Sequence, residues 1–470
     1  MTETMTPPAG PAVRDAWPSS PAGPLAAGAT GRLPPALPLS RGAQTARFLG
    51  RPLAYLFGAQ RQLGETFAFE VVHREEPIIL TAHPDHVRSL LTAPAALVPS
   101  MAAESPLRPI LGASSVLTAN GPRHLRQRKL LLPPFHGDSI ATYAAAIRRV
   151  AEREVDRWRV GDEFRMAERM QAVTLEVIMA GLFGVEGEPA AGSPERGLRD
   201  ATRRTLKLSE GRAWQVLEVL SATHTEPQGL MKVIFDRVDA HYYRTIAARR
   251  AIPEAERGTD VLSLLLATRD EEGRALDDRE VRDELMTLVL AGHETTANQL
   301  AWTFERLVRV PDAHAALRDA VRGGDGHAYV EATIHEAMRV RPVIPIIGRR
   351  VQAPWQLGEY VIPAGHPVSV ALPLLHHRED LYPQPFRFAP ERFLGVKPNT
   401  YTWLPFGGGT RRCLGASLAI AEQRIVLETI ARRVDLEAVD PRPEREQHRN
   451  VTMIPRDGGT VRVRRLAEAA

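Results

Sequence analysis

The chain contains one cysteine, Cys413, among its 470 residues. A single thiol can form neither an internal disulfide nor a metal site built from several cysteines, so neither can hold this fold together. The thiol is therefore a free core residue, a nucleophile or the one protein ligand of a metal cofactor. Three glycines and two arginines precede it, and a helical pattern follows at residues 416–432. Because positive charge and a helix N-terminus lower the pKa of a thiol, we expect a thiolate that acts as a ligand.

The segment around this cysteine carries the pattern F-x-x-G-x-R-x-C-x-G, with its fixed positions at Phe406, Gly409, Arg411, Cys413 and Gly415. It resembles the haem-binding loop of the cytochrome P-450 monooxygenases at each fixed position. The resemblance implies haem b (iron protoporphyrin IX) as the cofactor and Cys413 as the axial ligand of its iron. It also implies that Phe406, Arg411 and Gly415 help to bind the haem. A thiolate ligand favours O–O cleavage at haem iron. The alternative is a buried, inert cysteine at the start of a helix.

Helical patterns dominate the chain, and short strand patterns lie near both ends. The predicted strands cover residues 67–72, 77–82, 344–352 and 368–372. The predicted helices cover residues 84–91, 142–160, 166–182, 198–220, 231–251, 260–269, 278–309 and 329–341. This order predicts an α+β fold that is mainly α. The resemblance implies the cytochrome P-450 fold, a triangular helical prism with a long central oxygen-binding helix and small peripheral sheets.

Residues 1–38 contain nine prolines among alanines and glycines, which predicts a disordered or extended leader. Residues 39–470 are expected to form a single haem-thiolate monooxygenase domain, because the motifs run across this whole range. No stretch of 18 apolar residues indicates a membrane span. Sixty basic against 56 acidic residues is too small an excess to indicate nucleic-acid binding. A cytoplasmic location fits a free thiolate.

The longest helical pattern, residues 278–309, has poor helix formers at its centre, over residues 291–296. A kink or widened turn is expected there. The run resembles the acid–threonine pair of the family's oxygen-binding helix. It implies that Glu294 and Thr295 are the catalytic residues that deliver protons, with Ala291 beside the haem. The alternative is that these polar residues lie in a buried helix and make their hydrogen bonds within the protein.

Glu336 and Arg339 lie three residues apart, on one helical face. Such a pair is usually a weak surface contact. The resemblance instead implies a buried pair that is joined by Arg392. This structural triad would lock the coil that positions the cysteine loop.

Haem carries two propionates, which need cations. Arg411 is one candidate, and His124 and Arg128 form an H-x-x-x-R pair on one helical face that matches the family's propionate contacts. Strand alternation lets only one of Arg349 and Arg350 face the haem, and the resemblance favours Arg349. The alternative for the helical pair is a solvated basic face.

The glycine loop does not contain the G-x-G-x-x-G pattern of a dinucleotide site, and no flavin or nicotinamide region is fused to the chain. Electrons are therefore expected from separate partners, a ferredoxin with its reductase or a flavodoxin. An acidic carrier would be steered by the remaining cations near the cysteine, Arg123, Arg126, Lys129 and Arg412.

By resemblance, the substrate would contact residues 94–120, 206–220 and 343–347, together with Ala291, Thr295 and Met453, and Trp214 would form a bulky wall. These residues are mainly apolar, so a terpenoid, fatty acid, steroid or polyketide-like molecule is expected. The predicted function is a haem monooxygenase that inserts one atom of O2 into such a molecule. The alternatives are a peroxide-driven hydroxylase of the same fold, a non-catalytic haem sensor and a haem-free helical scaffold.

Overall fold

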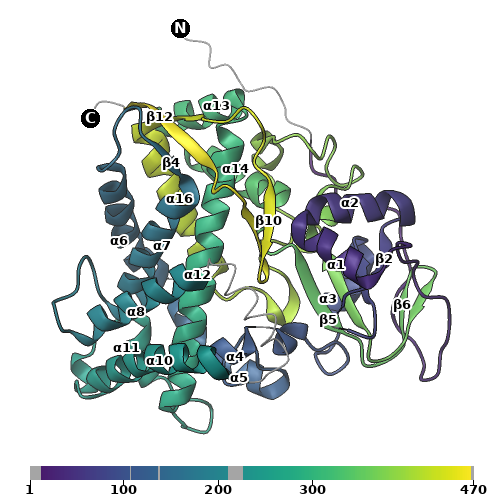
Figure 1. Ribbon diagram of the computed structural model, residues 1–470, viewed down its shortest axis with the longest axis horizontal. Helices are drawn as coiled ribbons and strands as arrows, with labels where there is room; N and C mark the ends of the chain where they lie inside the picture. The colour runs from purple at the N-terminus through teal and green to yellow at the C-terminus, as the bar shows by residue number, and fades with distance from the viewer. Residues whose placement is uncertain (1–11, 73, 106, 136–137, 210–225, 467–470) are drawn as a thin grey trace.

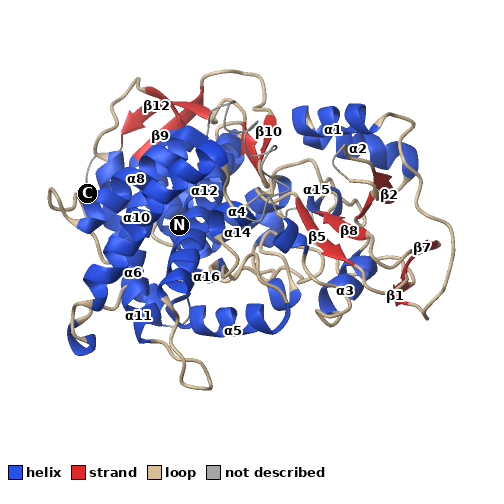
Figure 2. Cartoon of the chain, turned by 60° about the horizontal axis from the view of Figure 1, so that its bottom comes forward, coloured by secondary structure: helices blue, strands red, loops and turns tan. Residues whose placement is uncertain are grey.

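The computed structural model describes residues 12–466, apart from residues 73, 106, 136–137 and 210–225. Most of the long helices lie on one side of the molecule, and two of the four small sheets that the described strands form lie toward the other side (Figure 2). The helices are α1 (Arg41–Gly50), α2 (Pro52–Leu63), α3 (Pro84–Thr92), α4 (Arg108–Leu111), α5 (Gly121–Leu131), α6 (Asp138–Val155), α7 (Met166–Phe183), α8 (Pro194–Ser209), α10 (Gly229–Arg250), α11 (Val261–Ala267), α12 (Asp278–Leu307), α13 (Pro311–Arg322), α14 (His327–Val340), α15 (Leu372–His376) and α16 (Ala416–Arg433). Among these helices, none combines the length and the hydropathy of a bilayer-spanning segment.

The strands form small sheets that join distant parts of the chain. They are β1 (Ala22–Pro24), β2 (Thr66–Phe69), β3 (Ile78–Thr81), β4 (Glu163–Arg165), β5 (Ile346–Arg350), β6 (Trp355–Leu357), β7 (Tyr360–Ile362), β8 (Pro367–Ala371), β9 (Val434–Ala438), β10 (Glu446–Arg449), β11 (Thr452–Pro455) and β12 (Thr460–Leu466). Their orders are β1-β6-β7, β2-β3-β8-β5, β4-β12-β9 and β10-β11. Among the described strands, β3 and β8 pair in parallel, and the other pairings are antiparallel.

The long helix α12 runs through the middle of the molecule (Figure 1). It starts with the expected capping box: the Glu280 amide donates to Asp277 Oδ1 at 2.7 Å, and the Asp277 amide donates to Glu280 Oε2 at 3.1 Å. The first half of α12 buries Leu285 and Val289 in a core shared with α7, α10 and α11. The second half buries Phe304 in another core shared with α6, α14 and α16. The polar centre of α12 therefore lies between two hydrophobic cores.

Residues 291–296 are α-helical throughout, so the expected widened turn is wrong. The residues of this stretch have a low intrinsic helix propensity, but hydrogen bonds to the neighbouring helix α7 stabilise its helical conformation. Thr174 Oγ1 donates to the His293 carbonyl at 3.1 Å, and His293 Nε2 lies 3.0 Å from the Gln171 carbonyl. Tertiary contacts thus override the weak helix-forming tendency of the sequence.

The predicted helices and strands are present, with ends that differ by a few residues. The predicted helix at 198–220 corresponds to α8 as far as Ser209, and residues 210–220 lie outside the described part of the chain. The segment at residues 92–120 holds two short helices, η1 (Met101–Glu104) and α4.

The leader is wrongly predicted as disordered over residues 12–38, and the extended alternative is confirmed for the strand at residues 22–24. Strand β1 pairs with β6, and Trp17 Nε1 donates to Asp85 Oδ1 at 3.1 Å. Proline favours extended backbone, but composition does not reveal the partners that hold such a segment in place. Residues 1–11 lie outside the described residues.

Candidate active site

Cys413 lies in the loop between the 3₁₀ turn η5 (Gly409–Arg411) and helix α16. The Cys413 amide donates to the Phe406 carbonyl at 2.8 Å and closes the loop. Gly409 has a φ of +63°, and a Cβ there would lie 2.1 Å from the Leu91 carbonyl oxygen. A Cβ on Gly408 would lie 2.7 Å from Leu91 Cδ1. The loop therefore needs its glycines in order to pack directly against the last turn of α3.

The Cys413 side chain is accessible at the surface of the loop. The protein atoms around the sulfur nevertheless desolvate the thiolate form. Burial raises the pKa of Cys413 and outweighs the lowering by the Gly415 amide and by the charges of Arg128 and Arg412. The expectation of a lowered thiol pKa is therefore wrong for the protein without a metal, because desolvation of the thiolate is the larger effect. A bound metal would keep this sulfur deprotonated.

Four basic side chains from three elements converge near the cysteine. They are His124 and Arg128 of α5, Arg349 of β5 and Arg411 of η5. Burial and the charges of Arg411, Arg128 and Arg349 lower the pKa of His124 to about 4, so its ring is neutral at pH 7. Within the described residues, none of the four forms an ion pair with an acid.

The three arginines instead donate to carbonyl groups, which leave their charge uncompensated. Arg128 Nη1 reaches the Arg412 carbonyl at 2.8 Å, and Arg349 Nη1 reaches the Gly348 carbonyl at 3.0 Å. Arg411 donates to the carbonyls of the loop that precedes α5, at 3.2 Å for Val116. Burial lowers the pKa of Arg349 to about 10. Arg411 also has a pKa lowered to about 10, by burial and then by Arg349 and Arg128.

Buried cations are rarely left without an anion. Arg349 is buried and Arg128 and Arg411 are half-buried, so this cluster suits a negatively charged partner. Two carboxylates of a haem would supply the charge, and the accessible sulfur of Cys413 would face the iron. The residues present therefore fit a haem. Arg350 does not belong to the cluster, because it pairs with Glu104 at 2.7 Å, as strand alternation predicts for one arginine of the two.

The predicted acid–threonine pair lies on α12 but has different partners. Thr295 Oγ1 donates to the Ala291 carbonyl at 2.6 Å. Glu294 Oε1 accepts from Arg449 Nε at 2.8 Å and from Arg449 Nη2 at 2.5 Å, and Thr452 Oγ1 lies 3.4 Å away. Both residues that hold Glu294 belong to the β10-β11 hairpin. Sequence reasoning missed Arg449, which lies 155 residues away and carries no motif.

The structure brings Glu336, Arg339 and Arg392 together in a wholly buried network. Glu336 Oε2 lies 2.7 Å from Arg339 Nε and 3.1 Å from Arg392 Nε, and all three side chains have no exposed surface. The Ala389 amide donates to Glu336 Oε1 at 2.8 Å. The network ties helix α14 to the coil that leads to the cysteine loop.

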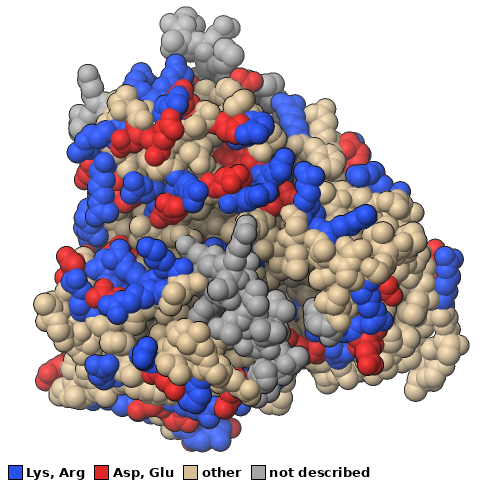
Figure 3. All heavy atoms as spheres, in the orientation of Figure 1, with Lys and Arg blue, Asp and Glu red and all other residues tan. Residues whose placement is uncertain are grey.

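The expected cationic docking face is largely neutralised by acids of the chain itself. Arg126 pairs with Asp270 and with Glu280, each at 2.8 Å, and Lys129 pairs with Glu271 at 2.7 Å. The expectation that Arg126 is free to attract a carrier is therefore wrong. Arg123 donates to Ser114 Oγ at 2.7 Å, whereas Arg412 is exposed. Figure 3 also shows Lys and Arg interleaved with Asp and Glu over the helical side of one face.

The residues expected to contact a substrate are only partly described. Trp214 lies outside the described residues. Ala291 is exposed, whereas Met453 has no accessible surface, and its amide donates to the Val343 carbonyl at 2.7 Å. Ile347 lies beside the cysteine loop, because a Cβ on Gly407 would be 3.7 Å from its Cδ1.

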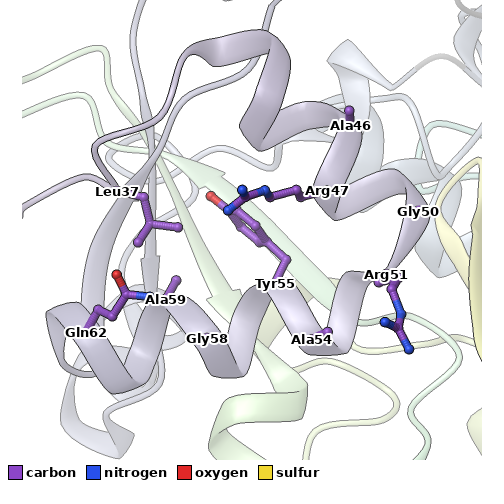
Figure 4. A pocket seen from close by; sticks show the side chains of 10 residues that line it. All are labelled: Leu37, Ala46, Arg47, Gly50, Arg51, Ala54, Tyr55, Gly58, Ala59 and Gln62. Atoms are coloured by element: carbon purple, nitrogen blue, oxygen red, sulfur yellow. The ribbon is translucent and has the colours of Figure 1, made fainter.

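A separate pocket of about 320 Å³ lies between α1 and α2 (Figure 4). Small and apolar side chains such as Leu37 and Ala59 line it together with Tyr55, Arg47 and Arg51. None of the predicted site residues lines this pocket. It is therefore distinct from the site around Cys413.

Comparison with known proteins identifies relatives of the chain. The family model for cytochrome P450 matches residues 33–462. Cytochrome P450 135B1 of Mycobacterium tuberculosis is 36% identical, over 92% of this chain and 91% of that protein. Cytochrome P450 138 of Mycobacterium bovis is 36% identical, over 92% of this chain and 97% of that protein. The structure of a retinoic acid-bound cyanobacterial CYP120A1 is similar with a TM-score of 0.77 at 20% identity, over 93% of this chain and 100% of that chain.

The buried network predicts a large loss of stability in Glu336→Gln. The change leaves two guanidinium groups without their shared anion, so the free energy of unfolding should fall by about 3–5 kcal/mol in urea titrations. Glu331→Gln is the matched control on the same helix, because Glu331 is 54% exposed and its contact with His335 is loose, at 3.8 Å. A loss below about 1 kcal/mol for Glu336→Gln would contradict the proposed importance of the network.

The lowered pKa of His124 predicts a pH-dependent stability in the haem-free protein. Between pH 6.5 and 4 the unfolded chain binds a proton at this residue while the folded chain, with a pKa of about 4, does not, so stability falls as the pH falls. From pH 7 to pH 5 the wild type should lose about 1–2 kcal/mol more than His124→Gln. The control is His366→Gln, at a half-buried side chain that forms no ion pair among the described residues. Identical pH profiles for the wild type and His124→Gln would show that the imidazole is not held in its neutral form.

Proposed function

The chain belongs to the cytochrome P450 family, and we propose that its residues 39–470 form one domain that inserts an atom of O2 into a hydrophobic small molecule. Members of the family are haem monooxygenases that bind haem b, and the fold is the cytochrome P450 fold, α+β and mainly α. One observation of the site carries the proposal. Four basic residues, of which His124 and Arg349 are buried and Arg128 and Arg411 half-buried, lie beside the single, accessible cysteine with no acid paired to them among the described residues.

The haem supplies the activation of dioxygen and the transfer of one oxygen atom. The chain would hold the haem iron through Cys413 Sγ and the propionates through Arg128, Arg349 and Arg411. Neutral His124 would add one N–H donor. Ala291, Phe406 and Gly415 are proposed to lie against the ring.

Glu294 and Thr295 are proposed to carry protons to the reacting oxygen. Glu294 lies at the centre of α12, and its side chain is 16% exposed, so it can exchange protons with solvent. The Thr295 hydroxyl donates to the Ala291 carbonyl and keeps its lone pairs free to accept from a water molecule. A proton taken up at the Glu294 carboxylate could then pass through water to Thr295 Oγ1.

An apolar substrate is part of the proposal, in the class of terpenoids, fatty acids, steroids or polyketide-like molecules. Ala291, Ile347 and the partly buried Val116, Leu117 and Val451 offer apolar contact near the site. Shape and buried area select the ligand in such a pocket. The retinoic acid in the cyanobacterial structure is a ligand of that protein, and at 20% identity the likeness concerns the fold.

Electrons are proposed to come from a ferredoxin with its reductase, or from a flavodoxin, in the reducing cytoplasm. The exposed Arg412 next to Cys413 suits an acidic carrier. The acid–threonine pair supports this route over a peroxide-driven hydroxylase, and over a sensor that would not need proton delivery.

The test of the proposal is the difference spectrum of the reduced protein with and without carbon monoxide. A strongly red-shifted Soret band is expected, because it reports a thiolate on the iron. Cys413→Ser is the matched control, and it should bind haem without that band. A haem-loaded wild type that lacks the band would refute thiolate ligation. A wild type that takes up no haem would favour the alternative of a haem-free helical scaffold.

Thr295→Ala should separate electron consumption from product formation. Loss of the hydroxyl removes a proton-delivering group, so peroxide should accumulate and product per reducing equivalent should fall by about tenfold or more. Thr303→Ala is the matched control, since Thr303 Oγ1 also donates to the carbonyl four residues earlier on the same helix, at 2.8 Å. Unchanged coupling in Thr295→Ala would mean that protons arrive by another route.

A further inference from the structure

Residues 12–24 form an extended segment, here called the strap, that lies across the start of helix α3. The family model matches residues 33–462, so the strap lies outside the matched residues. Its last residues form β1, which pairs with β6. The Gly358 amide donates to the Pro21 carbonyl at 2.7 Å, and the Arg14 amide donates to the Leu381 carbonyl at 2.9 Å. Both ends of the strap are therefore fastened to the body of the protein.

Between these ends, the strap donates hydrogen bonds to one carboxylate, that of Asp85. Asp85 Oδ1 accepts from Trp17 Nε1 at 3.1 Å, and Asp85 Oδ2 accepts from the Ser20 amide at 2.9 Å. Burial alone would raise the pKa of Asp85, but these two hydrogen bonds and the nearby charges of His83 and Arg88 hold it below its ordinary value. Asp85 also lies in the first turn of α3, where negative charge is favourable.

Two histidines at the same end of α3 contact the strap as well. His83 Nε2 lies 3.0 Å from the Pro18 carbonyl, and His86 Nε2 lies 3.0 Å from Ser20 Oγ. His83 is the N-cap residue of α3, because its Nδ1 accepts from the Asp85 amide at 3.2 Å. The strap thus binds the side chains that start this helix.

The other end of α3 touches the cysteine loop. Leu91 is the residue against which Gly408 and Gly409 pack so closely that neither position has room for a Cβ. Midway along the helix, the Arg88 guanidinium lies 5.5 Å from the Trp17 ring and 5.2 Å from the ring of Tyr401, which precedes the loop. Helix α3 has nine residues, a rigid element of about 13 Å between the strap and the loop.

We propose that the strap, through Asp85 and α3, positions the cysteine loop so that Cys413 keeps its thiolate on the haem iron. Trp17, Ser20 and Asp85 are positioning residues, because they act on the cysteine loop through α3. The proposal rests on the proposed function, because it assumes Cys413 as the iron ligand. Leu91 packs so closely against the glycines that a displacement of α3 must also displace the loop.

The experiment compares haem-loaded wild type with Trp17→Phe, Asp85→Asn and the double variant. Trp17→Phe keeps the aromatic ring and removes the N–H donor, whereas Asp85→Asn removes the charge and keeps the shape. Asp15→Asn is the matched control, because Asp15 is an exposed carboxylate in the same strap with no hydrogen bond among the described contacts. The readouts are the loss of the red-shifted Soret band of the reduced carbon monoxide complex over time, below the unfolding temperature, and amide hydrogen exchange over residues 404–415.

Asp85→Asn should lose the band about tenfold faster than wild type, the factor expected from weakening hydrogen bonds to a charged acceptor. Trp17→Phe should act in the same direction, and the double variant should lose little more than Asp85→Asn, since both changes break one contact. Exchange at the Cys413 amide should speed up in step, while Asp15→Asn behaves as wild type.

Wild-type band lifetimes and wild-type exchange in Asp85→Asn and Trp17→Phe would overturn the proposal, and so would a lowered melting temperature with an unchanged loop. Trp17→Phe keeps the test valid if Asp85→Asn does not fold. If the wild type itself lacks the red-shifted band, the proposed function fails. The exchange data then still decide whether the strap holds the loop.

Discussion

The buried carboxylate of Glu336 holds together the part of the protein that presents the cysteine. It accepts from Arg339, from Arg392 and from the Ala389 amide. Arg339 in turn donates to the carbonyls of His376 and Pro385, at 2.7 and 2.9 Å. His376 Nε2 accepts from the Leu404 amide at 3.0 Å, two residues before Phe406. One anion thus organises helix α14, the following coil and the approach to the haem loop.

The contrast with the site itself is informative. In the Glu336 network the guanidinium groups share a carboxylate, whereas the four basic groups near Cys413 have no acid among the described residues. The first arrangement is complete within the protein, so removing one partner would leave an uncompensated buried charge. The second is complete only with an anionic ligand, so the binding energy of the ligand also relieves repulsion among the cations.

The short motifs could be predicted from the sequence because each depends on neighbouring residues. The cysteine loop, the long helix with its capping box and the Glu336–Arg339 pair all have local spacing as their signal. The partners of Glu294 and of Gly409 could not be predicted, because Arg449 and Leu91 lie far away in the chain and carry no pattern of their own. The direction in which the pKa of Cys413 is shifted could not be predicted either. Its helix and arginines were visible in the sequence, but the larger cost of burial depends on packing.

The parallel pairing of β3 with β8 has a consequence for how the protein is made. Ile79 pairs with Val368, so this sheet joins residues roughly 290 positions apart, and contacts between such distant segments form slowly. Helix α3 follows β3 directly and supports the cysteine loop, which comes later still in the chain. During synthesis on the ribosome, β2 and β3 can pair with each other early, but the other edge of β3 must wait until β8, at residues 367–371, has emerged. Haem would then enter a polypeptide that is almost complete, as one of the last steps of its maturation.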